Sequence, residues 1–401
     1  MMRAFKTAGF IFALLLVLFL AECRKTPETS LQTIFPGTAR HRRYSDGAVL
    51  HRGGQELLLA VTVFGEDRHD YSSSEILGCV SHDGGRTWES SGAFVLQRNV
   101  GGWNVVGPSF VRLSDREVLF FFNRENSLLD AGTWLRRSLD NGATFGPPVR
   151  LPYEGFGDVV ADHVLRLENG RILVPYYEYR FPNASSANAY AYCFYSDDGG
   201  RTWKQSNKVT LTKPAEGREI AFAANEAPRR MVYSAEEPSV VELKDGRLLM
   251  FVRTYVKSFY KSYSNDKGAT WSELTDSGVQ APGSTPVLAR IPSTGDLLLL
   301  FNYGDQDEIL GKWPRNRLAS AVSFDEGRNF TSVRILDGSR NFPGRMTQPN
   351  VTFLGEKALI FYPKSLTPDG YSSWMQRTVP VQWFYEGDHG RVLGEATSKG
   401  G

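Results

Sequence analysis

One octapeptide pattern, Ser-x-Asp-x-Gly-x-Thr-aromatic, recurs along the chain and limits what it can fold into. Five copies begin at Ser81 (SHDGGRTW), Ser138 (SLDNGATF), Ser196 (SDDGGRTW), Ser264 (SNDKGATW) and Ser323 (SFDEGRNF), and their starts lie 57, 58, 68 and 59 residues apart. The Asp and Gly suit a tight hairpin turn, because the carboxylate accepts backbone N–H bonds and glycine adopts positive φ. We therefore interpret these aspartates as structural, and the repeat predicts an array of similar units.

A second repeat alternates with the first and consists of a short apolar strand, a turn rich in Asp and Gly, and a more apolar strand. Six copies begin near Gly47, Pro108, His163, Pro238, Pro286 and Pro349. Each period then holds four antiparallel strands, the unit of a propeller blade. The sequence therefore predicts an all-β fold, a six-bladed β-propeller over residues 41–393. No sixth octapeptide is present, so we expect the segment after Pro349 and an N-terminal strand near residues 31–35 to close the ring.

The remaining segments and the composition limit the possible domain organisation and function. Residues 23–40 are expected to form a linker and the ring-closing segment, and residues 394–401 a flexible tail. The 401 residues carry 46 Lys plus Arg against 44 Asp plus Glu, a net charge of +2, which offers no basic excess for nucleic acid. The sequence contains neither a phosphate-binding Gly-Lys-Ser/Thr loop nor a Gly-x-Ser-x-Gly elbow, so we expect no cofactor. It also lacks zinc-type spacing, and we expect no metal, although the many carboxylates leave calcium in a loop open. Cys79 and Cys193 each stand beside bulky residues in a strand-like segment, so we expect buried free thiols there rather than a disulfide. We also expect a monomer.

The amino terminus has the features of an export signal. Arg3 and Lys6 precede an apolar run over residues 10–20, which is short for a membrane span. Residues 1–22 are therefore predicted to be a signal peptide, and the protein to be exported to the periplasm or the cell surface. Cys23 follows the run as in a bacterial lipoprotein signal, although Glu22 stands where that pattern prefers a small residue. Lipid anchoring to a membrane through Cys23, a plain cleaved signal and an uncleaved anchor all remain open.

The path of a four-stranded unit places certain strand ends together. Residues just before the first strand, after the second and before the third should meet at one mouth of the ring, while the octapeptide turns lie on the opposite face. The mouth positions include eight candidate site residues: Arg43, Asp46, Asp70, Asp162, His163, Glu237, Arg253 and Arg315. Arginines gathered there suit a carboxylate-bearing ligand, because guanidinium binds carboxylate bidentately. The alternative is that such pairs only brace neighbouring units, and His163 alone is more often a packed histidine.

Together the octapeptides, the hairpins and the Glu237…Arg253 pair resemble the sialidase superfamily, in particular bacterial sialidase-like proteins with bacterial-neuraminidase (Asp-box) repeats. The resemblance implies three arginines that hold a sugar carboxylate, an acid/base Asp, and a Tyr nucleophile activated by a Glu. Glu237 and Arg253 match the Glu and the second Arg. Arg315 matches the third, with Arg317 as the fallback, and Arg43 is an approximate match to the first. Asp70 is the acid/base candidate, with Asp46 behind it.

The resemblance fails at the nucleophile, because Gln348 stands where the family carries Tyr (RMTQPNVTF). Glutamine cannot attack an anomeric carbon. Another residue therefore attacks, or water attacks with a carboxylate as base, or the protein binds sugar without cleaving it.

Two functional hypotheses follow. The first is an exported glycoside hydrolase, exo-α-sialidase-like, that acts on an acidic sugar such as sialic acid in a glycan. Asp70 and Glu237 would be catalytic, and Arg43, Asp46, Arg253 and Arg315 would bind substrate, with Asp162 and His163 on its hydroxyls. The second is a non-catalytic carbohydrate-binding propeller, a lectin or glycan-capture protein. A neutral-sugar hydrolase or a lyase is a third reading. Hydrolases place their two carboxyl groups roughly 5 to 9.5 Å apart, which separates the first two hypotheses.

Overall fold

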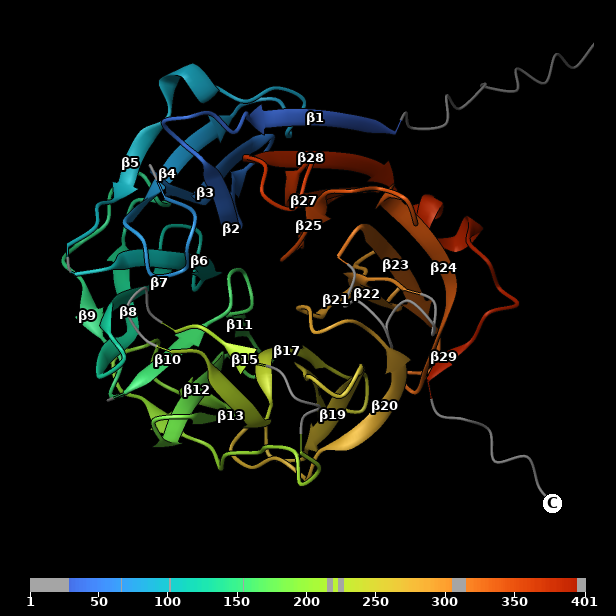
Figure 1. The fold of residues 1–401 in the computed structure, drawn as a ribbon. Helices are drawn as coiled ribbons and strands as arrows, with labels where there is room; N and C mark the ends of the chain where they lie inside the picture. The colour runs from blue at the N-terminus through green and yellow to red at the C-terminus, as the bar shows by residue number, and fades with distance from the viewer. Residues whose placement is uncertain are drawn as a thin grey trace, which may run out of the picture.

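The fold consists of β-sheets that follow one another around a common centre (Figure 1). The computed structural model describes residues 29–394 except residues 66, 101, 154, 215–218, 223–226 and 305–314. Within these residues the helices are two short 3-10 turns, η1 (Ser90–Gly92) and η2 (Val381–Glu386), and the all-β prediction is confirmed. No helix in this part of the chain has the length and apolar character needed to cross a membrane. The predicted signal peptide and Cys23 lie outside the described residues.

The strands form five sheets. The largest combines β1 (Ser30–Phe35), β2 (Arg43–Gly53), β3 (Glu56–Phe64), β4 (Ser74–Ser81) and β5 (Phe94–Gln97) with β25 (Arg345–Met346), β26 (Asn350–Leu354), β27 (Lys357–Ser365) and β28 (Ser372–Pro380). Next along the chain come β6 (Asn104–Arg112), β7 (Val118–Ser127), β8 (Asp130–Ser138) and β9 (Val149–Arg150).

The other three sheets lie between these two along the ring. One holds β10 (Phe156–Val159), β11 (Leu165–Arg166), β12 (Ile172–Asn183), β13 (Ser186–Ser196), β14 (Lys204–Gln205), β15 (Glu219–Ile220) and β16 (Arg229–Tyr233). The next holds β17 (Glu236–Glu242), β18 (Leu248–Arg253), β19 (Ser258–Ser264) and β20 (Thr275–Gln280). The last holds β21 (Val287–Arg290), β22 (Leu297–Asn302), β23 (Arg317–Ser323), β24 (Asn329–Gly338) and β29 (Leu393–Gly394).

All six predicted inner hairpins are confirmed as antiparallel pairs: β2/β3, β6/β7, β11/β12, β17/β18, β21/β22 and β26/β27. Their second strands are apolar runs such as LLLLFN in β22, in which every residue is buried. Such runs fit strands covered on both faces, here by the neighbouring sheets. The core therefore lies between consecutive sheets. The residues at the ends of the inner strands are outside this core.

The octapeptide turns have the structural role predicted for them. Each of β4, β8, β13, β19 and β23 ends at the first serine of a copy. In the first copy Ser81 Oγ accepts the N–H of Gly85 at 2.9 Å and donates to Asp83 Oδ1 at 2.9 Å. Asp83 also accepts the backbone N–H of Thr87 at 2.9 Å and its hydroxyl at 2.7 Å. Both carboxylate oxygens of the aspartate are thus hydrogen-bonded within its own turn.

The octapeptide glycine also sets the distance between sheets. Gly268 has φ of +85°, and a Cβ placed on it would lie 2.5 Å from Leu173 Cδ1 in the preceding sheet. Gly85 makes the equivalent close approach to Leu359 of β27. A larger residue at Gly268 would therefore push two sheets apart, and one at Gly85 would push the first octapeptide turn away from β27.

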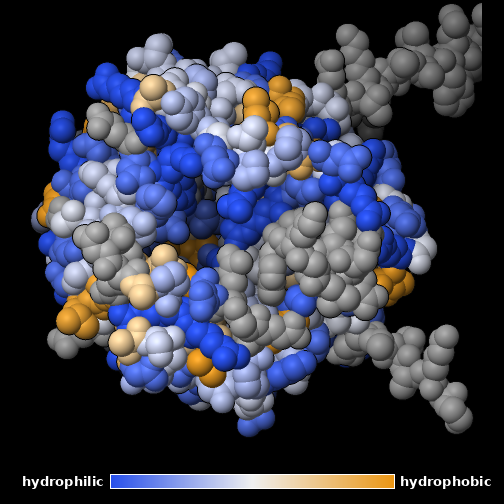
Figure 2. All heavy atoms as spheres, viewed as in Figure 1, coloured by the Kyte–Doolittle hydropathy of each residue, from blue (hydrophilic) through white to orange (hydrophobic). Residues whose placement is uncertain are grey.

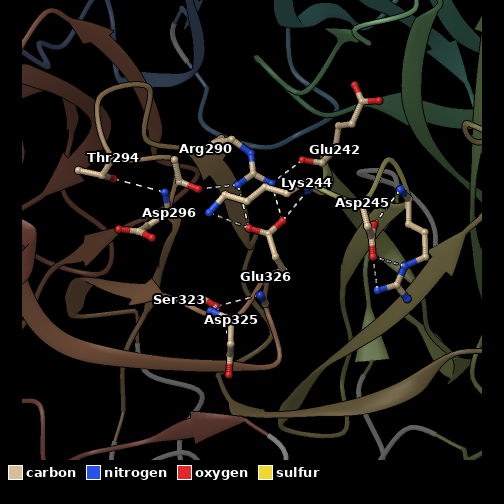
Figure 3. A network of polar contacts seen from close by, with 12 residues as sticks. Glu242, Lys244, Asp245, Arg290, Thr294, Asp296, Ser323, Asp325 and Glu326 are labelled. Carbon is tan, nitrogen blue, oxygen red and sulfur yellow. Dashed lines mark hydrogen bonds and ion pairs between the residues drawn. The ribbon is translucent and has the colours of Figure 1, made fainter.

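Polar contacts join neighbouring sheets on the octapeptide face (Figure 3). Arg290 at the end of β21 donates to both carboxylate oxygens of Glu326, at 3.0 and 2.8 Å, and to the Glu242 carbonyl at 2.6 Å. Glu326 in turn accepts the backbone N–H of Lys244 at 2.8 Å. This clasp ties the turn between β23 and β24 to the β17–β18 hairpin, so its charges serve packing rather than a ligand.

Strands far apart in the sequence, β1 and β28, meet in one sheet. β1 pairs antiparallel with β28, from Ser30 opposite Thr378 to Phe35 opposite Trp374, as expected for a strand near residues 31–35 (Figure 1). β28 also touches β2 through a parallel bridge between Arg43 and Ser372. At the other end, Gly394 of the predicted tail pairs with Asn329 in β24, and residues 395–401 lie outside the described part.

Candidate functional site

A cavity of about 650 Å³ opens at the centre of the ring on the face opposite the octapeptide turns. Figure 2 shows a hollow near the centre of the face, bordered mainly by hydrophilic residues. Six of the eight predicted site residues line the cavity, and Gln348 lies with them: Arg43, Asp46, Asp70, Glu237, Arg253 and Arg315. The positions at strand ends therefore bring together residues from three separate hairpins, β2/β3, β17/β18 and β26/β27, and from the segment before β23.

Arg43 begins β2 and reaches Asp70, which follows β3. Its Nη1 donates to Asp70 Oδ1 at 2.6 Å and to the Arg68 carbonyl at 2.8 Å, and its guanidinium lies 4.6 Å from the centre of the Phe64 ring. The Asp70 side chain is 86% exposed, so it stands at the open side of the cavity. The adjacent Arg43 charge lowers the pKa of Asp70, which keeps this carboxylate ionised while the pair persists.

Arg253 ends β18 between two carboxylates of β17. Its Nη1 donates to Glu237 Oε1 at 2.6 Å, and its Nε lies 3.6 Å from Glu236 Oε2. Nη2 donates to the Tyr255 hydroxyl at 2.5 Å. The second oxygen of Glu237 accepts the Thr285 hydroxyl, so both of its oxygens are occupied. Burial raises the pKa of Glu236 to about 7, although Arg253 opposes the shift.

Arg315 differs from these two arginines. Its Nη2 donates to the carbonyl of Gly283, and no carboxylate among the described residues lies within ion-pair distance of it. Burial, followed by repulsion from Arg253, lowers the pKa of Arg315 to about 10, so it stays a cation at neutral pH. Arg345, which the sequence reasoning missed, also lines the cavity and adds to this repulsion. Its position three residues before Gln348 was the available signal.

Three buried carboxylates, Asp46, Glu125 and Asp158, also line the cavity. Burial raises the pKa of Asp46 to about 6. Burial raises the pKa of both Glu125 and Asp158, that of Asp158 to about 7, and the charge of Asp158 adds to the shift of Glu125. The Asn104 amide donates to Glu125 at 3.0 Å and the Tyr177 hydroxyl to Asp158 at 3.3 Å. Sequence reasoning missed this pair, although Glu125 lies near the end of the second strand of its hairpin, where the same rule applied.

Gln348 contacts the first hairpin. Its Oε1 accepts the Ser45 hydroxyl at 3.2 Å, and the same hydroxyl lies 3.0 Å from Asp46 Oδ2. Gln348 and Glu237 have φ of +40° and +47°, which is uncommon for residues other than glycine. Such backbone strain persists where the surrounding structure holds it and is found most often at functional sites.

Aromatic rings form another wall of the cavity. Phe156, Tyr177, Tyr179 and Phe222 all line it. The ring centres of Tyr179 and Phe222 are 4.8 Å apart in an edge-to-face arrangement, and those of Tyr177 and Tyr179 are 5.6 Å apart. The cavity thus combines charged groups with apolar ring faces, the combination expected of a site for a small polar ligand that has an apolar side.

Asp162 and His163 are not brought to this cavity, which corrects their expected placement. They line a separate cavity of about 120 Å³ with Ser239 and Asn350. His163 Nδ1 bonds the Pro238 carbonyl at 2.9 Å, and burial lowers the pKa of the imidazole to about 4. The reason is an unpredicted strand, because β10 pairs with the end of β12 and places Asp158 at the central cavity instead.

The structure also bears on the expectations for metal ligands and for the two cysteines. Within the described ranges no three His, Cys, Asp or Glu side chains are grouped so that they could hold a metal ion. Cys79 and Cys193 are free and buried, as predicted.

Comparisons with known proteins place this geometry in context. The family model for the BNR repeat-like domain matches residues 104–371. Human Sialidase-4 is 30% identical over 116 residues, a stretch that covers 25% of this chain and only 24% of that protein.

Three solved structures share the fold. A protein of unknown function from Dyadobacter fermentans has a TM-score of 0.64 at 16% identity, and the match covers 91% of this chain and 99% of that one. Trypanosoma rangeli sialidase in complex with sialic acid has a TM-score of 0.63 at 16% identity, with 88% and 59% covered. A Hadza microbial sialidase has a TM-score of 0.66 at 14% identity, with 88% and 68% covered. Identities this low establish the fold alone.

Proposed function

Because the chain belongs to the BNR repeat-like domain family and has sialidase-like relatives, we propose that it is a glycoside hydrolase that binds an acidic sugar in the central cavity. The sugar is a carboxylate-bearing one such as sialic acid at the end of a glycan. Trypanosoma rangeli sialidase, which binds sialic acid, supports this substrate class by its fold only.

Arg315 is the observation that carries the proposal. Arg315 is half-buried, and a guanidinium that is partly withdrawn from water is costly unless a counter-ion or hydrogen-bond acceptors satisfy its five N–H groups. Its contact to the Gly283 carbonyl satisfies only part of that need, and Arg253 and Arg345 add positive charge nearby. A carboxylate on the ligand would supply the missing partner through a bidentate pair. A neutral sugar would leave the charge uncompensated.

The other charged groups divide the remaining tasks. Asp70 stands at the open side, where a leaving group would depart, and is proposed as the proton donor. A substrate carboxylate that engages Arg43 would weaken its pair with Asp70 and so raise the pKa of Asp70 towards that of an acid. Glu237, predicted to be catalytic, has both oxygens engaged and is better suited to hold Arg253 in position.

One observation favours a second function, a lectin that captures glycans without cleaving them. Gln348 occupies the position at which the resemblance places the tyrosine nucleophile, and no glutamine can form a glycosyl–enzyme bond. A binding protein needs only the arginines and the aromatic wall.

Hydrolysis assays separate the two functions. The protein is tested on fluorogenic sialosides and uronic-acid glycosides beside Arg315→Ala, which removes a cation without orphaning a carboxylate. Arg98→Ala is the matched control, because Arg98 is exposed and lies outside the cavity. We expect the parent and the control to release the fluorophore. In Arg315→Ala we expect kcat/KM to fall roughly 10- to 100-fold, the effect of losing hydrogen bonds between the guanidinium and the substrate carboxylate. Binding on a glycan array without release would establish the lectin, and neither binding nor release would refute both.

The ring is proposed to be a closed six-bladed propeller. Three facts support this. The described residues contain six inner hairpins, the octapeptide of the first unit packs on Leu359 of β27, and β1 pairs with β28 in the sheet that also holds β2. Small-angle X-ray scattering at several concentrations would test both this compact shape and the expected monomer.

Export and lipid anchoring are proposed from the sequence. The basic residues and apolar run before Cys23 support them. In a bacterial host, the full chain should partition with membranes and incorporate labelled palmitate, whereas Cys23→Ala should incorporate none. Full incorporation by Cys23→Ala would place the lipid elsewhere, and a cytoplasmic chain would refute export.

A further inference from the structure

We propose that Asp46, held by Ser45 beside Gln348, is the general base that activates a water molecule for direct attack on the sugar, so that hydrolysis inverts the anomeric configuration. The inference rests on the proposed hydrolase function. It assigns to Asp46 and a water molecule the attack that a tyrosine carries out in the family that this chain resembles.

A β-bulge aims Asp46 into the cavity. The pairing of β2 with β3 shifts register between Ser45 and Gly47, so Asp46 is the extra residue of β2. Bulges redirect side chains and occur next to active sites. Gly47 fits only as glycine, because a Cβ there would collide with Trp374, and its carbonyl accepts the Asn350 amide at 2.5 Å. The bulge is therefore held in place by β28 and β26.

The two oxygens of Asp46 have different surroundings. Oδ2 faces the Ser45 hydroxyl at 3.0 Å. No described residue donates a hydrogen bond to Oδ1, yet it is not among the fully enclosed atoms without a partner. Because Asp46 lines the cavity, this oxygen is open to a water molecule there. A carboxylate with one anchored and one free oxygen is the arrangement that a general base needs.

Ser45 and Gln348 complete the water site. Ser45 Oγ accepts from Arg43 Nη2 at 3.3 Å and has a single proton for two acceptors, Asp46 Oδ2 and Gln348 Oε1. Since Gln348 Oε1 faces this hydroxyl, its amide Nε2 is turned away from it and can donate to a ligand in the cavity. Gln348 is thus a positioning residue for the water. The strained backbone of Gln348 holds its side chain in place.

Asp46 and Asp70 lie on different sides of one guanidinium. Arg43 Nη1 bonds Asp70, and Nη2 bonds the serine that carries Asp46. Asp70 is exposed, whereas only 8% of Asp46 is exposed, so the two carboxyl groups address the open and the closed side of a bound sugar. Inverting glycosidases keep their acid and base about 6.5 to 9.5 Å apart to leave room for water, and the Arg43 guanidinium, which contacts Asp70 on one side and Ser45 on the other, stands between the two carboxyl groups.

The charges around Asp46 suit a base. Burial raises its pKa to about 6, Arg43 opposes the rise, and Asp70 and Glu237 add to it. At neutral pH most of the carboxylate is therefore ionised, while its affinity for a proton is higher than that of an exposed aspartate. A general base works best when its pKa lies near the pH at which it operates.

The step balances with water as the only co-reactant. The water oxygen bonds to the anomeric carbon as the bond to the glycosidic oxygen breaks. The electron pair of that bond goes to the leaving oxygen, which takes the proton of Asp70, and Asp46 takes a proton from the water. The products are the sugar in the opposite anomeric form and a free alcohol, and solvent exchange then resets both carboxyl groups.

The first test needs no variant. Proton NMR follows the cleaved sialoside or uronide from the first turnover, before the sugar mutarotates. We expect the inverted anomer to appear first. A retained anomer would overturn this inference and leave the hydrolase function intact. If the parent protein releases no sugar, the proposed hydrolase function is refuted, and this inference with it.

The second test removes the base. Asp46→Asn should lower kcat by roughly 10²- to 10⁴-fold with KM nearly unchanged, and azide should restore turnover by forming the inverted glycosyl azide. In the parent, kcat/KM should rise with pH through an apparent pKa of about 6. The matched control is Asp115→Asn, an exposed aspartate in the β6–β7 turn outside the cavity. An Asp46→Asn protein that turns over like this control would overturn the inference.

Discussion

Replacing Asp46 by asparagine should stabilise the folded protein above neutral pH. The folded-state pKa of Asp46 is raised to about 6 from the usual 3.8, because burial disfavours the ionised form. The folded protein therefore holds this proton to higher pH than the unfolded chain does. Ionisation then costs stability as the pH rises from about 4 to about 6, and the full cost is present above that range.

The magnitude follows from the shift. Each pKa unit corresponds to about 1.4 kcal/mol, so the ionised carboxylate costs the parent about 3 kcal/mol at pH 8. Asparagine has nearly the same shape and cannot ionise. Asp46→Asn should therefore match the parent near pH 4 and exceed it by about 2 to 3 kcal/mol in free energy of unfolding at pH 8.

Urea denaturation at pH 4, 5, 6, 7 and 8, followed by tryptophan fluorescence, measures this difference. The parent, Asp46→Asn and Asp115→Asn are compared, and the last should track the parent at every pH. A variant that is more stable yet inactive would show that the site keeps a costly charge for its chemistry. A difference that stays constant with pH, or a variant less stable at pH 8, would refute the raised pKa and remove one support of the base assignment.

Further predictions concern packing and a buried histidine. Gly268→Ala should cost about 2 to 4 kcal/mol of stability through its positive φ and the collision with Leu173, whereas Gly170→Ala, with φ of +88° and open surroundings, should cost only the backbone part, about 1 to 2 kcal/mol. Equal losses in thermal denaturation would contradict the sheet-spacing role. The pKa of His163 is lowered to about 4, so the folded protein resists protonation, and its stability relative to His163→Gln should fall by about 2 kcal/mol between pH 7 and pH 5. Denaturation curves that stay parallel across that range would show that the imidazole titrates normally.

Much of the fold could be predicted because its determinants are local. The Ser-x-Asp-x-Gly turns bond within themselves, so their chemistry is visible in eight residues. The inner hairpins pair neighbours in the sequence, and apolar runs on both sides of a short turn indicate them. The strand-end rule then placed residues as distant as Asp70 and Arg253 at one cavity.

The rest depended on contacts that no local pattern encodes. β10 lies outside the repeat and replaces Asp162 by Asp158 at the cavity. The raised pKa values of Glu125 and Asp158 arise only when two separate sheets bury both groups together. The open oxygen of Asp46 depends on a one-residue bulge, which shifts register without any signal in hydrophobic periodicity.

The pairing of β1 with β28 also has a consequence in time. Ser30 faces Thr378, so β1 has no partner until the residues of β28 have been synthesised about 350 residues later. At roughly 5 to 20 residues per second, this interval lasts about 20 to 70 s. Until then β28 is missing and both β1 and β2 lack their neighbour, which exposes strand edges that invite aggregation. The central cavity takes residues from Arg43 to Gln348, so a nascent chain cannot assemble this site before residue 348 has been synthesised.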